Sequence, residues 1–63
     1  MKAIIKVGTV YKGVDNRTHF EVDERYEIEV EDIDILKSQL KKEYDDIYDI
    51  YINYKNIIIA LVY

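Results

Sequence analysis

The chain has 63 residues, with 13 acidic against 9 basic side chains, one histidine and no cysteine. A chain of this length folds as a single domain, residues 1–63, whose thin core leaves little room for an enclosed substrate cavity. The lack of cysteine excludes disulfides and thiolate chemistry, and the net charge of -4 argues against a protein that binds a nucleic-acid backbone.

The N-terminal half predicts two strands joined by a turn. Residues 2–11 alternate between apolar and polar side chains, as a half-buried strand does, and the glycine, aspartate and asparagine of residues 13–17 favour a reversal. Residues 18–30 alternate more cleanly. Their predicted apolar face consists of Phe20, Val22, Tyr26, Ile28 and Val30. Glu24 falls on that apolar face, which predicts a bulge, a bend or a break at this point.

The C-terminal half predicts a helix followed by a hairpin. Apolar residues recur every three or four positions from near Asp32 to near Glu43, which indicates a helix of about three turns with Asp32 as its N-cap. Residues 47–53 and 57–63 then indicate two strands around a turn without glycine. The predicted fold is α+β with the order ββαββ, an antiparallel sheet carrying one helix on one face.

The last strand is apolar on both faces, although one helix covers only one side of a sheet. A second copy of the chain would cover the other side, so a homodimer is expected. The alternative is that residues 57–63 form a central strand buried between the helix and its own neighbours.

Catalytic and ligand-binding chemistry has little support in the sequence. His19 and the few hydroxyl side chains show no arrangement of nucleophile and base, so no catalytic residue is predicted. The acidic residues Asp45, Asp46 and Asp49 lack the spacing of a calcium loop, so neither a metal site nor a cofactor is predicted. The tyrosines are interpreted as sheet-packing residues, with no direct nucleic-acid binding. No apolar run reaches the roughly 20 residues of a membrane span, so a cytoplasmic location is expected.

Acidic residues are concentrated in one segment of the chain. Residues 21–34 contain eight of the 13 carboxylates, with Arg25 as their single cation. Alternate residues of a strand lie about 6.6 to 6.8 Å apart, close to the spacing of phosphates on one DNA strand. The row therefore has the charge pattern of a nucleic-acid surrogate. Its alternative interpretation is a charged strand that stays soluble and resists edge-to-edge aggregation.

The segment from Tyr26 to Leu36 leads from an acidic strand into a short helix, and Asp45-Asp46-Ile47 leads into the next strand. This pattern, whose central motif reads Val30-Glu31-Asp32-Ile33-Asp34-Ile35-Leu36, resembles the small uracil-DNA glycosylase inhibitors of Bacillus phages. The resemblance covers about the last two thirds of the chain, with isoleucine at the position of an aromatic plug. Members of that family are DNA-mimicking dimers.

The resemblance implies an inhibitor that occupies the basic DNA-binding groove of a host enzyme, with uracil-DNA glycosylase as the first candidate. The implied protein-binding residues are Glu27, Glu29, Glu31, Asp32, Ile33 and Asp34. Ile33 would fill an apolar pocket of the enzyme, or it would belong to the helix core. Two other functions remain open: another phage inhibitor of a nucleic-acid enzyme, such as an anti-CRISPR protein, or a non-catalytic interaction or dimerisation module.

Overall fold

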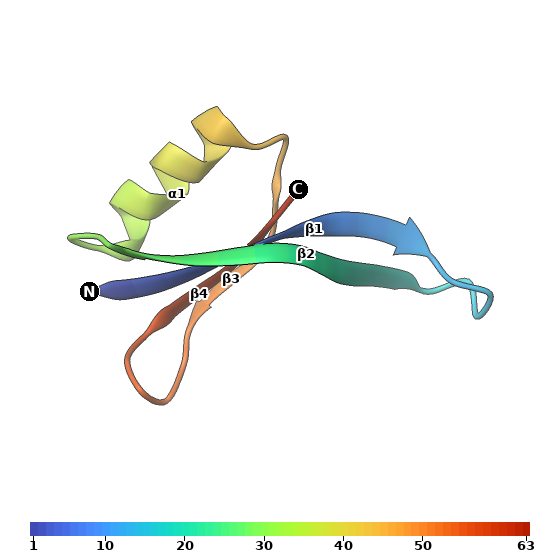
Figure 1. Ribbon diagram of the computed structural model, residues 1–63, viewed down its shortest axis with the longest axis horizontal. Helices are drawn as coiled ribbons and strands as arrows, with labels where there is room; N and C mark the ends of the chain where they lie inside the picture. Colours follow the sequence, from blue (N-terminus) through green and yellow to red (C-terminus); the bar gives the residue numbers. More distant parts are fainter.

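The computed structural model describes residues 1–63 and has the element order ββαββ. The elements are β1 (Lys2–Lys12), β2 (Thr18–Glu29), α1 (Ile33–Glu43), β3 (Ile47–Ile52) and β4 (Ile58–Val62). Figure 1 shows α1 lying on one side of the four strands, with the β1–β2 hairpin reaching beyond the others. The predicted α+β class and element order are therefore confirmed. The helix falls short of the length and apolar character that a membrane crossing requires.

The sheet has the strand order β2-β1-β4-β3. Its outer pairs are antiparallel, but the central strands β1 and β4 run parallel, so the sheet is mixed rather than purely antiparallel as expected. Parallel neighbours require a long crossover connection, and the chain between β1 and β4, which includes α1, provides one. β4 is thus a central strand, which explains why four of its five residues are buried.

The core lies between α1 and the face of the sheet that it covers. α1 contributes Leu36 and Leu40, which are spaced one turn apart as the apolar stripe predicted. The sheet contributes Ala3, Ile5, Ile58, Ala60 and Val62. The N-cap prediction is confirmed, because the carboxylate of Asp32 accepts a hydrogen bond from the N–H of Ile35 at 2.9 Å.

A bulge in β2 lies beside the position predicted for it. Glu24 pairs with Val7 and Val22 pairs with Gly8, so Asp23 is an extra residue without a partner on β1. One extra residue reverses the alternation of side chains along the strand. Val22 therefore lies on the opposite face from Tyr26.

That reversal corrects the predicted apolar face of β2. Tyr26 and Ile28 pack against the core below α1, whereas Phe20 lies on the other face of the sheet. There the ring of Phe20 crosses over Gly8 and stacks on Tyr48 of β3, with 5.1 Å between the ring centroids. Gly8 permits this crossing because it has no Cβ.

Both hairpin turns place an asparagine in the left-handed region of the backbone, including the C-terminal turn, which has no glycine. Asn56 in the β3–β4 turn has a φ of 62°, and Asn16 in the β1–β2 turn has a φ of 61°. Asparagine tolerates this left-handed region better than other residues with a Cβ. Asn53 also accepts a hydrogen bond from the N–H of Lys55 at 2.9 Å, which closes the β3–β4 turn. The predicted C-terminal hairpin is confirmed.

Two phenols join β2 to the end of α1. The hydroxyls of Tyr26 and Tyr44 lie 2.8 Å apart, and Tyr44 is the C-cap residue of the helix. Burial is the main cause that raises the pKa of Tyr26 well above its ordinary value of 10.0, and the hydrogen bond with Tyr44 adds to the effect. The native state therefore favours the protonated phenol.

Because the folded pKa of Tyr26 exceeds the unfolded one, its contribution to stability is complete below about pH 10 and is lost as pH rises toward the folded value. We expect the free energy of unfolding of the wild type to fall above pH 10. The free energy of unfolding of the Tyr26→Phe variant should fall less steeply there. Urea titrations at pH 8, 10 and 11 measure the difference. Parallel curves for the two proteins would contradict this linkage.

Candidate protein-binding surface

The acidic residues of β2 do not form one row, because the bulge divides them between the two faces of the sheet. Glu27 pairs with Ile4, and Glu29 pairs with Lys2, on the face away from α1. Beyond the bulge, Glu21 pairs with Thr9 on the opposite face. The continuous row of evenly spaced carboxylates that the sequence suggested is therefore absent.

The two predicted site residues on β2 are paired with the protein's own cations. The Nζ of Lys2 lies 3.3 Å from Glu27, and the guanidinium of Arg25 lies 3.8 Å from the same carboxylate. The N-terminal ammonium lies 3.7 Å from Glu29. Exposed pairs of this kind contribute about 0 to 1 kcal/mol each, but they reduce the local negative charge. Glu27 and Glu29 therefore attract a basic partner less strongly than unpaired carboxylates would.

The remaining predicted carboxylates lie together at the corner where β2 ends and α1 begins (Figure 1). We call Glu31, Asp32, Asp34 and their neighbour Ile35 the acidic corner. Its three carboxylate residues are exposed, and none takes part in an ion pair. Asp32 uses one oxygen as the helix cap and keeps the other free. The positive end of the helix dipole favours negative charge here, so the carboxylates are stable without counterions from the chain.

The structure places Ile33 against the core rather than in solvent. It is partly buried and packs on the cluster that contains Leu36 and Leu40. The apolar residue that is exposed at this corner is Ile35, with 39% of its surface accessible. The sequence contained a signal for it, because Ile35 is apolar but out of phase with the stripe formed by the other helix residues. An apolar anchor at the acidic corner would therefore be Ile35.

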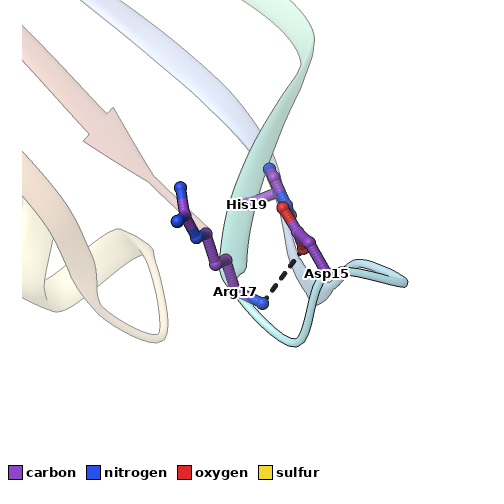
Figure 2. A network of polar contacts seen from close by, with 3 residues as sticks. All are labelled: Asp15, Arg17 and His19. Carbon is purple, nitrogen blue, oxygen red and sulfur yellow. Dashed lines mark hydrogen bonds and ion pairs between the residues drawn. The ribbon is translucent and has the colours of Figure 1, made fainter.

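The tip of the β1–β2 hairpin holds a second polar group of residues, shown in Figure 2. The Nε2 of His19 lies 3.0 Å from Asp15, and the backbone N–H of Arg17 donates to the same carboxylate at 3.0 Å. The contact with His19 is the main cause that lowers the pKa of Asp15, and the hydrogen bond from the backbone of Arg17 adds to it. The His19 ring also stacks on Tyr11 at 5.5 Å. These contacts order the turn within one hairpin.

A shallow hollow lies beside the β1–β2 pair, lined by Lys2, Glu27, Ile28 and Glu29. Its charged side chains belong to the ion pairs already described. No protein-family model, curated protein or solved structure matches the chain.

Proposed function

We propose that the protein is an acidic, non-catalytic inhibitor that binds the basic nucleic-acid groove of a host enzyme through its acidic corner. The observation that carries this proposal is the set of exposed carboxylates without ion-pair partners that lie within four residues of the exposed Ile35. Such carboxylates speed association with a basic surface, and an apolar side chain that enters a pocket slows dissociation. Uracil-DNA glycosylase is the first enzyme to test, and a phage-encoded inhibitor would act in the host cytoplasm.

The proposed surrogate for DNA is smaller than the row that the sequence suggested. It consists of the strand–helix corner, because the carboxylates of β2 are paired or lie on another face. A few charges placed around one anchor are sufficient for a protein interface, since a handful of central residues carries most of the binding free energy. Affinity should fall as salt is raised, because the corner is exposed to solvent.

The test is a uracil-excision assay with the protein added to the glycosylase. We expect the wild-type chain to inhibit, and the corner variant Glu31→Gln/Asp32→Asn/Asp34→Asn to inhibit at least about tenfold more weakly. Asparagine at position 32 keeps an N-cap side chain, so the helix is preserved. Circular dichroism verifies that the variant is folded.

A matched control removes the same number of charges elsewhere, through Glu21→Gln/Glu24→Gln/Glu43→Gln, residues that are exposed and outside the corner. This control should inhibit as the wild type does. Equal weakening in both variants would show that net charge alone matters and would reject the corner. Failure of the wild-type chain to inhibit would reject this glycosylase as the target.

A second candidate function is an interaction or dimerisation module. It is supported by the sheet face opposite α1, which nothing in the chain covers and which exposes the side chains of Val22 and Tyr51.

A further inference from the structure

The face of the sheet away from α1, here called the open face, combines an apolar centre with charged margins. Register with the buried residues places Ile4, Ile59 and Leu61 in its centre, on the two middle strands. Tyr51 and Val22 extend the apolar surface toward the edges, each with 45% of its surface exposed. In a single chain Ile59 is 6% exposed, and Ile4 and Leu61 are partly buried. The apolar surface left in water is therefore mainly that of Tyr51 and Val22. Each Å² of apolar area left in water costs about 25 cal/mol.

The charges of the open face have a regular arrangement across the sheet. One cross-strand row runs from Arg25 on β2 through Lys6 and Leu61 to Asp49 on β3. It therefore has cations on one side and a carboxylate at the opposite edge, about 14 Å from Arg25 at three strand spacings. Such a row is complementary to a copy of itself turned end for end.

The adjacent row has the same property. It runs from Glu27 on β2 through Ile4 and Ile59 to Tyr51 on β3. A carboxylate that accepts hydrogen bonds stands at one end, and a phenol that donates one stands at the other. Turning the row end for end places Glu27 against a Tyr51 hydroxyl and brings Ile4 against Ile59.

We propose that a second copy of this chain covers the open face, related by a twofold axis that runs along the strands between β1 and β4. Arg25 of one copy then faces Asp49 of the other, and Lys6 faces Leu61, so the Arg25–Asp49 contact occurs twice. Ile4 and Ile59 form the apolar centre near the axis. The two sheets pack face to face at about 10 Å, and each α1 lies on the outside.

The edges of the sheet are less suitable for association than the open face. On β3, the N–H of Ile50 donates to Asp49 at 2.9 Å, and the N–H of Ile47 donates to Asp46 at 2.8 Å. Donors that are engaged in this way are not free to pair with another strand. The other edge, β2, carries a bulge and alternating charges, which also oppose strand pairing.

This dimer does not depend on the proposed inhibitor function. The acidic corner lies in the connection from β2 to α1 and in the first turn of α1, and α1 covers the face opposite the interface, so each copy should keep its corner exposed. Loss of dimerisation and loss of inhibition are therefore separable outcomes. If both surfaces operate, the assembly presents two corners to its partners.

A charge-swap experiment with analytical ultracentrifugation tests the proposal. Wild type should be a dimer at micromolar concentration, and Arg25→Asp or Asp49→Arg alone should weaken dimerisation at least about tenfold, because each creates like-charge contacts. The double variant Arg25→Asp/Asp49→Arg restores opposite charges across the axis, and most of the affinity should return. Glu21→Lys, a reversal on the other face, should leave the dimer unchanged.

The recovery in the double variant separates a direct contact from damage to the fold. A double variant as weak as the singles would overturn the assigned pairing, as would a Glu21→Lys chain that dissociates equally. A wild-type chain that remains monomeric at about 100 μM would overturn the proposal and assign the open face to a different partner.

Discussion

Replacing Leu36 by alanine should reduce the free energy of unfolding by about 2 to 5 kcal/mol. Leu36 is a fully buried residue of α1, and it packs on the central strands of the sheet. The truncation removes buried methyl groups and leaves a cavity that one helix on a sheet closes incompletely. A domain of this length has about 3 to 9 kcal/mol of stability in total, so much of it would be lost.

Ile35→Ala is the matched control, because Ile35 is the residue just before Leu36 in the same helix but is exposed. Truncating this exposed side chain should change the free energy of unfolding by about 0.5 kcal/mol or less. Urea denaturation followed by circular dichroism measures both variants. Similar midpoints for the two would show that α1 does not pack as described, and would also remove the distinction between a core residue and an anchor at this corner.

Gly8→Ala is expected to destabilise the protein by about 1 to 3 kcal/mol or more through overpacking. A Cβ at this position would lie 2.1 Å from the backbone carbonyl oxygen of Glu21 and 2.7 Å from the ring of Phe20. The carbonyl belongs to the β1–β2 ladder beside the bulge and has little freedom to move. The ring would have to leave Gly8, which would break its stack on Tyr48.

Gly13→Ala tests whether the effect is specific to that crossing. The atoms nearest to its Cβ would be side-chain atoms of His19 and Asp15, at 2.8 to 2.9 Å, and these side chains are exposed enough to shift. The expected loss is therefore smaller than for Gly8. Comparing the denaturation midpoints decides the matter, and a Gly13 variant that is the less stable of the two would refute the role given to Gly8.

Both predictions have consequences for function. The core below α1 holds the acidic corner in place, and the stacked pair of Phe20 and Tyr48 defines one end of the open face. A functional variant is informative only if its stability is measured as well, because a domain this small has little free energy to lose.

The sequence by itself determined the elements of this protein. The change from a period of two to a period of three or four separated the strands from the helix, because these periods follow from local backbone geometry. Asp32 was identifiable as a cap because it precedes the first helical turn, and the contact that confirms it spans three residues. Glu24 indicated an irregularity in this strand, but the extra residue is its neighbour Asp23, and Glu24 itself stays in register with Val7 on the face of Tyr26, where it is exposed.

Only the tertiary structure decided how these elements are arranged and which surface each side chain occupies. The parallel pairing of β1 with β4 joins the two ends of the chain, and no local pattern specifies it. The bulge at Asp23 moved Phe20 to the open face, and packing assigned Ile33 to the core and Ile35 to solvent. Periodicity defines two sides of a segment, but which side faces the core depends on register and on long-range packing.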